Sequence, residues 1–263
     1  MIDGLKQLGA LGMKVPEQYG GLGLSQVYYN RALALAASSH AAISTMLSAH
    51  QSIGVAEPLL LFGSEERKWF VLPYDSDGIT VEHRNAFMGL RGIENSVTRV
   101  ENVFVPRENV IAKEGQGLKI ALTTLNTGRL ALPAICVGSA KWATRVAREW
   151  SSERVQWGQA IGKHDAVAQK LAFIAASTFG LEAVVDVSSR LADDKKNDIR
   201  IEAAIAKLYA SELGWHVVDE LVQIRGGRGY ETAESLLARG EEPIPRRAGA
   251  ARYANQSHLR GIE

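Results

Sequence analysis

The chain has 263 residues, of which 46% are apolar and 22% charged, the composition of a globular protein with a sizeable core. Basic residues (30) nearly balance acidic ones (29) and form no basic stripe, so nucleic acid is not an expected partner. The single cysteine, Cys136, excludes an internal disulfide framework and predicts a buried structural thiol. We find no apolar run of about 20 residues and no N-terminal targeting pattern, and therefore expect a cytoplasmic chain without a membrane span.

Residues 1–73 are predicted to form a helical domain. A loop rich in proline and glycine, V-P-E-Q-Y-G-G-L-G, follows a first helix over residues 2–8. Apolar periodicity then predicts helices over residues 26–37 and 40–53, with Ser38 and Ser39 as caps of the second. A short helix is expected over residues 65–71, with Ser64 as its N-cap and Pro73 beyond its end.

Residues 74–111 have a different pattern. Residues 78–82 and 98–106 alternate apolar and polar side chains and are rich in β-branched types, so both are predicted to be strands. Residues 89–92 are the expected turn between them. Because an isolated hairpin is marginally stable and leaves its edges unpaired, this segment is interpreted as the remnant of a larger β-domain.

Residues 112–245 are predicted to form a helix bundle, which makes the fold class mainly α. Apolar periodicity indicates three long antiparallel helices over residues 117–152, 165–193 and 198–225, with Asp165 and Asp198 as caps. A fourth helix would complete the bundle. Residues 246–263, where it is expected, contain two glycines and no apolar stripe, so they are interpreted as an aberrant tail.

The segment Q-I-R-G-G-R-G-Y, residues 223–230, closes the last long helix. Its glycines allow positive φ angles and a close backbone approach to a bulky group. A helix C-cap followed by a tight turn is the alternative explanation of such a glycine pair.

The order of these segments, together with four motifs, resembles the acyl-CoA dehydrogenases. The motifs are V-P-E-Q-Y-G-G-L-G near the start, F-V-P-R-E-N-V-I at mid-chain, S-E-R-V-Q-W-G at 152–158 and Q-I-R-G-G-R-G-Y at 223–230. N-T-G-R-L at 126–130 is similar to the long-chain and very-long-chain branch. The resemblance is collinear and extends over most of the chain, and it implies an acyl-CoA dehydrogenase-like fold with helical domains around a middle β-domain.

Several site residues are implied by the resemblance. Those that would bind FAD of a neighbouring subunit are Arg154, Gln156, Trp157 and Gly158 in the motif S-E-R-V-Q-W-G, and Gln223, Gly226 and Gly227 in the glycine turn. Arg129 would line the acyl-CoA cavity. From the residues alone, Arg154 could equally be an exposed arginine at a helix end, and Arg129 a buried helical arginine paired with a carboxylate. No metal site is expected.

The reaction implied by the resemblance is the α,β-dehydrogenation of a fatty acyl-CoA in β-oxidation. A glutamate removes the α-proton while FAD takes the β-hydride, which gives a trans-2-enoyl-CoA. The resemblance further implies an electron-transfer flavoprotein-type acceptor, and a homo-dimer or tetramer because the cofactor would be shared across an interface.

This sequence departs from the family pattern in two ways that bear on catalysis. Most of the middle β-domain, including the loops that would cover the flavin ring, has no counterpart between Pro73 and Asp75, and the family glutamate after P-I-P (243–245) is absent. The family's alternative position for the base is Gly128 here. Glu241, Glu242 and Glu263 lack an apolar pocket that would raise a carboxyl pKa, so they are poor substitutes. The alternative function is therefore a catalytically inactive, degenerate fragment that acts at most as an oligomerising helical module.

A one-base insertion near codon 245 would explain the C-terminal departure. The family would read V-E-R-V-L-R-D-T-R-I-N-L-I-F-E-G-S, and permitted codons for residues 246–262 give this whole string when read one base later. We expect sequencing of the gene to find codons compatible with the shifted frame. A codon in this stretch that cannot give the shifted residue would refute the hypothesis.

Overall fold

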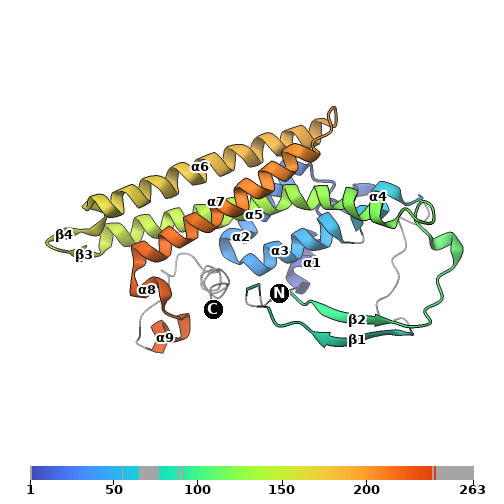
Figure 1. The fold of residues 1–263 in the computed structure, drawn as a ribbon, viewed down its shortest axis with the longest axis horizontal. Helices are drawn as coiled ribbons and strands as arrows, with labels where there is room; N and C mark the ends of the chain where they lie inside the picture. The colour runs from blue at the N-terminus through green and yellow to red at the C-terminus, as the bar shows by residue number, and fades with distance from the viewer. Residues whose placement is uncertain are drawn as a thin grey trace.

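The structure is a computed structural model that describes residues 2–54, 56–64, 77–87, 89–90, 92–238 and 240. In these ranges the chain is mainly α-helical, as predicted, and its strands form two small two-stranded sheets (Figure 1). Three long helices lie side by side, the N-terminal helices pack against two of them, α5 and α6, and a β-hairpin lies apart from the bundle (Figure 1). The predicted tail 246–263, with Glu241 and Glu242, lies outside the described residues.

The N-terminal segment is helical. Its elements are α1 (Ile2–Gln7), η1 (Ala10–Gly12), η2 (Glu17–Tyr19), α2 (Gln26–Ser39), α3 (Ala41–Ser48), the π-helical turn η3 (Ala49–Ile53) and α4 (Ala56–Phe62). The prediction that Ser38 and Ser39 cap the second helix is wrong. His40, which has an extended backbone, separates α2 from α3, and its Nδ1 accepts the backbone N–H of Ala42 at 3.2 Å. Ser38 instead donates to the carbonyl of Leu35.

Helix α4 was not predicted from the sequence. It begins shortly after Gly54 and ends before Gly63, and Pro58 lies in its first turn, where a missing N–H costs nothing because that group has no helical partner. The predicted helix over residues 65–71 lies outside the described residues.

The β-hairpin occupies the segment predicted to contain two strands. β1 (Ile79–Arg84) pairs antiparallel with β2 (Ser96–Val100), with an irregularity in register between Val81 and His83. The second strand is shorter than the predicted 98–106 because Asn102 takes a left-handed conformation (φ 52°), which ends the extended backbone. Val100 and Phe104 are 65% and 84% exposed, as expected where the rest of a sheet is missing.

The bundle consists of α5 (Gly117–Glu153), α6 (Asp165–Asp194) and α7 (Arg200–Arg225), close to the predicted bounds. Helix α6 runs opposite to both α5 and α7 (Figure 1). The hairpin β3 (Val155–Gln156) and β4 (Gln159–Ala160), followed by η6 (Ile161–Lys163), connects α5 to α6. Two short helices, α8 (Gly227–Tyr230) and α9 (Ala233–Ala238), follow α7, and η5 (Arg107–Asn109) precedes α5.

Neither predicted aspartate is the N-cap residue of its helix, because Ile199 occupies that position in α7 and His164 in α6, both without a side-chain cap bond. Asp198 accepts the backbone N–H of Arg200, the first residue of α7, at 3.1 Å. Asp165 is instead the first residue of α6, makes no side-chain cap, and accepts from Gln169 Nε2 at 2.7 Å. A carboxylate in a first turn still interacts favourably with the positive end of the helix dipole.

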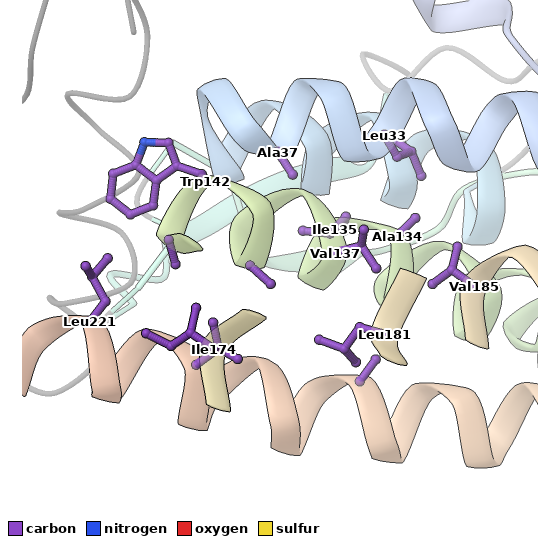
Figure 2. Packing of buried hydrophobic residues seen from close by; sticks show 14 of the residues in the cluster. Leu33, Ala37, Ala134, Ile135, Val137, Trp142, Ile174, Leu181, Val185 and Leu221 are labelled. Carbon is purple, nitrogen blue, oxygen red and sulfur yellow. The ribbon is translucent and has the colours of Figure 1, made fainter. Parts of the chain in front are cut away.

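Four helices supply the core. Figure 2 shows Leu33 and Ala37 of α2 facing Ala134, Ile135 and Val137 of α5, with Ile174, Leu181 and Val185 of α6 and Leu221 of α7 on the other side. Many core positions of α5 are alanine or glycine, so its neighbours approach closely. Helix α5 is therefore the central helix, covered by the N-terminal domain on one side and by α6 and α7 on the other.

Helices α2 and α5 are in direct backbone contact at Gly138. A Cβ atom built on Gly138 would lie 2.1 Å from the carbonyl oxygen of Ala34 and 2.9 Å from the Cβ of Ala37. Polar contacts join α2 to both α5 and α6. Asn30 donates to the carbonyl of Leu130 at 3.2 Å, and the Asp193 carboxylate accepts the first N–H groups of α2. A carboxylate at this position satisfies helix donors and complements the helix dipole.

Helices α5 and α6 are long and apolar enough to cross a membrane when judged by length and composition alone. The core helix of a bundle meets the same two criteria, and 44% of the apolar window of α5 is buried inside this fold. The absence of a membrane span stays a prediction.

Replacing Gly138 with alanine is expected to lower the free energy of unfolding by about 1–3 kcal/mol, because the added methyl group forces the α2 and α5 backbones apart. The change should outweigh the gain of about 1 kcal/mol in helix propensity. Gly180→Ala in α6 is the matched control: its Cβ would have only the Tyr209 hydroxyl in contact, at 3.5 Å, so it should be neutral or stabilising. Urea unfolding followed by circular dichroism measures both, and a Gly138→Ala chain as stable as the parent would contradict the close crossing.

Candidate functional site

A pocket of about 720 Å³ lies where the end of α5, the β3–β4 hairpin, the start of α6 and the end of α7 meet. We call it the arginine–glycine pocket. Its lining includes three arginines and two adjacent glycines; the residues that line it are Trp150, Arg154, Gln156, Trp157, Ile161, His164, Ala166, Val167, Gln223, Ile224, Arg225, Gly226, Gly227, Arg228 and Glu231. Arg154, Gln156 and Trp157 are thus brought together with Gln223, Gly226 and Gly227.

The β3–β4 hairpin presents Trp157 at its tip. Trp157 (φ 49°) and Gly158 (φ 82°) form its two-residue loop, and positive φ at both positions defines a type I′ turn. This conformation is uncommon for a bulky residue, and such backbone strain is concentrated at functional sites. His164 supports the turn: its Nε2 lies 3.1 Å from the carbonyl of Gln156, and its ring packs edge-on against Trp157. Trp157 remains 87% exposed, so its indole face is available to another group.

The glycine turn contributes open backbone. Gly226 ends α7 with φ 57° and ψ −139°, and its N–H donates to the carbonyl of Gln223 at 3.1 Å. A Cβ atom built on Gly226 or on Gly227 would have no other atom within 4 Å, so the backbone at both residues faces open space. Gly229 differs, because its Cβ would lie 2.6 Å from the carbonyl oxygen of Val222. The turn is therefore a helix C-cap, and it also leaves a stretch of backbone that a ligand can approach.

Positive charge gathers in the arginine–glycine pocket. Arg228 pairs with Glu231, with Nη1 and Oε2 3.4 Å apart. The Arg225 guanidinium lies over the ring of Trp150 at 5.0 Å, and its Nε is buried without a hydrogen-bond partner in the described structure. Burial, and to a smaller extent Arg228, lowers the pKa of Arg225 from its ordinary value. Arg154 is exposed, and no ion pair to it occurs among the described residues.

A second pocket, of about 470 Å³, lies between α3, α5 and the start of α7; we call it the Arg129 pocket. Its lining is largely apolar with two cations; the residues are Thr45, Ser48, Ala49, Ile53, Leu125, Gly128, Arg129, Leu132, Ala204 and Lys207. Arg129 donates to the Asn126 side chain at 3.2 Å rather than to a carboxylate. None of these lining residues in the described part of the chain is Asp or Glu.

The position Gly128 carries no side chain, and there is little room for one. A Cβ built there would lie 2.6 Å from Cγ2 of Ile53. Thr127, the neighbour of Gly128 in sequence, donates its hydroxyl to the carboxylate of the buried Glu57 at 2.9 Å. Glu57 does not line the Arg129 pocket. Among the described residues, neither Gly128 nor its surroundings supply a base to the Arg129 pocket.

Cys136 fits the prediction of a structural thiol. It is half-buried in α5 and packs against Gly214 of α7. A Cβ atom built on Gly214 would lie 3.3 Å from the Cβ of Cys136. Burial raises the pKa of the Cys136 thiol to about 11, although Lys207 acts in the opposite direction. A thiol that stays protonated is a poor nucleophile.

Sequence reasoning missed several residues of the two pockets. Trp150, His164 and Lys207 line them but belong to no motif that was singled out, and Arg225 stands in the motif Q-I-R-G-G-R-G-Y without having been named as a site residue. The sequence did carry one signal for Arg225. An arginine directly before a glycine pair at a helix end lies close to any ligand that approaches the open backbone of the glycines. The β3–β4 hairpin was also missed, since Trp-Gly is an unusual type I′ pair.

Family comparison agrees with this architecture. The family model described as "Acyl-CoA dehydrogenase, C-terminal domain" matches residues 115–252, and "Acyl-CoA dehydrogenase, N-terminal domain" matches residues 1–77. The first match covers more than half of the chain. The chain belongs to the acyl-CoA dehydrogenase family, which confirms the resemblance seen in the sequence.

Individual relatives support the family and show what the chain lacks. Probable acyl-CoA dehydrogenase FadE10 of Mycobacterium tuberculosis is 47% identical over 321 residues, covering 93% of this chain and 49% of that protein. Very long-chain specific acyl-CoA dehydrogenase, mitochondrial, of Rattus norvegicus is 27% identical over 311 residues, covering 87% of this chain and 47% of that protein. The chain spans about half the length of the curated relatives it matches. Both aligned stretches are longer than the 263 residues of this chain, so the relatives hold residues within them that this chain does not.

Solved structures confirm the fold. Butyryl-CoA dehydrogenase from Megasphaera elsdenii superposes with a TM-score of 0.84 at 25% identity, covering 99% of this chain and 85% of that chain. Acyl-CoA dehydrogenase complexed with FAD from Bacillus anthracis superposes with a TM-score of 0.80 at 21% identity, covering 98% of this chain and 56% of that chain. The acyl-CoA dehydrogenase-like fold, mainly α with a shortened β-domain, is therefore established.

Proposed function

We propose that this chain serves in the FAD-dependent dehydrogenation of fatty acyl-CoA to trans-2-enoyl-CoA, with FAD bound at the arginine–glycine pocket. The observation that carries the proposal is the convergence of Arg154–Trp157 and Gln223–Gly227, two segments far apart in sequence, on one pocket. The FAD complex of the Bacillus anthracis relative supports the choice of cofactor.

The residues present suit the adenosine and pyrophosphate end of FAD. The guanidinium of Arg154 offers a planar fork of donors to paired phosphate oxygens. The backbone at Gly226 and Gly227 is open, so a ligand can approach it where a side chain would otherwise intervene. The exposed indole of Trp157 offers a flat apolar face to an adenine ring.

We further propose, from the family resemblance, that the cofactor is shared between chains. On α5 the lining residues of the two pockets that come nearest to each other, Leu132 and Trp150, lie about 27 Å apart at 1.5 Å per residue, so the pockets are separate sites. A flavin whose adenosine end occupies one chain's arginine–glycine pocket would react in the Arg129 pocket of another chain, which would make the protein a homo-dimer or tetramer.

In the Arg129 pocket the chain would bind and orient the acyl thioester. Apolar side chains of η3, α5 and α7 exclude water from the acyl chain, while Arg129 and Lys207 supply positive charge for anionic groups of acyl-CoA. When bound, FAD supplies the hydride acceptor, and an electron-transfer flavoprotein-type protein would take the electrons on. The α-proton needs a carboxylate whose pKa is raised by a dry cavity.

A second candidate function is a helical module that binds the cofactor and self-associates without dehydrogenating a substrate. The observation that favours it is the lack of Asp and Glu among the described residues that line the Arg129 pocket. Exposed apolar side chains on α7, such as Ile201, Ile205 and Leu208, are consistent with association.

Purified chain incubated with FAD and freed of excess cofactor is expected to show the visible absorption of bound flavin. Anaerobic addition of a long-chain acyl-CoA then separates the two functions: bleaching supports the dehydrogenase, and a coloured chain that does not bleach supports the module. A colourless chain would contradict both.

A glutamate introduced by Gly128→Glu, combined with Ile53→Ala to remove the 2.6 Å clash, is expected to place a base in the Arg129 pocket. General bases contribute about 100- to 10,000-fold, so the rate of flavin bleaching by acyl-CoA should rise by a factor in this range over the matched Gly128→Gln, Ile53→Ala control. Stopped-flow absorbance measures both rates. Equal rates would mean that the reacting α-carbon does not lie beside Gly128.

A further inference from the structure

The π-helical turn η3 is an irregular part of the wall of the Arg129 pocket. Ala49 and Ile53, its first and last residues, line the pocket, whereas Gln51 and Ser52 are buried and do not line it. A π-helical turn has i→i+5 hydrogen bonds, is rare, and occurs frequently at functional sites. Because such a turn holds more residues than an α-helical one, it changes which side chains face the pocket.

Gln51 ties η3 to the N-terminal segment. Its side chain is 1% exposed, its Oε1 accepts the backbone N–H of Lys14 at 3.0 Å, and its Nε2 donates to the carbonyl of Ala10 at 2.8 Å. The next residue, Ser52, is also buried, and its hydroxyl lies 2.9 Å from that of Tyr29. A buried donor or acceptor that loses its partner is costly, so these bonds fix the turn in place. Gln51 therefore acts on the pocket wall without touching the pocket.

Ile53 closes the pocket over Gly128. Its Cγ2 would lie 2.6 Å from a Cβ atom built on Gly128, so the two segments touch with no room for a further group between them. The side chain of Ile53 is 45% exposed, so a ligand in the pocket can reach it. If η3 took α-helical hydrogen bonding instead, Ile53 would turn about the helix axis by about 100°, the share of one residue in a helical turn. The wall over Gly128 would then open.

We propose that Gln51 is a positioning residue of the Arg129 pocket. By holding η3 in its π-helical form it keeps Ile53 against Gly128, and this contact makes the pocket select straight acyl chains over chains with a methyl branch near the thioester. The proposal rests on the proposed function, since it takes the Arg129 pocket as the acyl site, and it adds what sets the width of that site.

Isothermal titration of the chain with hexadecanoyl-CoA and 3-methylhexadecanoyl-CoA tests the proposal. The parent chain is expected to bind the straight ester about 10-fold or more tightly than the branched one, the usual effect of one misfitting carbon in an apolar pocket. Ile53→Ala removes the contact with Gly128, so it should lower this ratio to below about threefold by strengthening the binding of the branched ester. Gln51→Met keeps the length of the side chain but neither hydrogen bond, so it should lower the ratio in the same direction although residue 51 does not line the pocket.

Gln26→Met is the matched control. The side chain of Gln26 is also buried in the N-terminal segment, where it accepts from Lys14 Nζ and donates to Asn30, both at 2.9 Å. The same substitution therefore removes two hydrogen bonds without a contact to η3, and it should lower the melting temperature, measured by circular dichroism, while leaving the ratio unchanged.

A Gln51→Met chain that melts earlier but keeps the parent ratio would show that Gln51 only stabilises the fold. An unchanged ratio in Ile53→Ala would show that Ile53 does not limit the width of the pocket. Either result overturns the proposal, as does a parent chain that binds both esters equally or binds neither.

The outcome is distinguishable from failure of the proposed function. A chain whose preference for the straight ester depends on Gln51, but whose flavin does not bleach with acyl-CoA, would support the positioning role and refute the dehydrogenase. A chain that bleaches with acyl-CoA, but whose preference depends on neither Gln51 nor Ile53, would do the reverse.

Discussion

The backbone contact between α2 and α5 at Gly138 is the constraint on which this structure depends. It lets the N-terminal helices lie against α5 with only small side chains between them, and α5 in turn aligns α6 and α7. The bond of Asn30 to Leu130 adds polar specificity between α2 and α5, and the bonds of Asn30 to Ser189 and of Gln26 to Asp193 do the same between α2 and α6. Apolar contact supplies most of the driving force, whereas buried hydrogen bonds that must be satisfied limit the alternative arrangements.

Both candidate pockets are built from the same two helices. Near its middle α5 supplies Gly128 and Arg129, and at its end Trp150 leads to Arg154; α7 supplies Lys207 near its start and Arg225 at its end. Because the rise of a helix is fixed, the distance between the pockets follows from the residue numbers alone. The two shared helices thus set the distance between the two pockets.

The long helices were predictable because a 3.6-residue apolar period over many turns is a strong signal. Short elements were not: α4 contains a proline, and the Trp157–Gly158 turn uses a residue pair that propensities disfavour. Periodicity could not indicate that Arg154 and Gly226 share a pocket, since that depends on how three helices pack. The resemblance to a family supplied this pairing, whereas Arg225 and Lys207 became candidates only when the packing placed them in the pockets. Strand β2 ends earlier than predicted because Asn102 takes a left-handed conformation, which asparagine adopts more readily than most residues but which periodicity does not reveal.

The separation of the two pockets along α5 also has a genetic consequence. If each catalytic centre combines the arginine–glycine pocket of one subunit with the Arg129 pocket of another, a lesion in either pocket disables a centre that lies partly on a different polypeptide. Two inactive alleles, one altered at Arg154 and the other at Arg129, would then complement each other when expressed together. In a mixed pair of subunits both lesions fall in one centre, and the other centre is assembled entirely from intact surfaces.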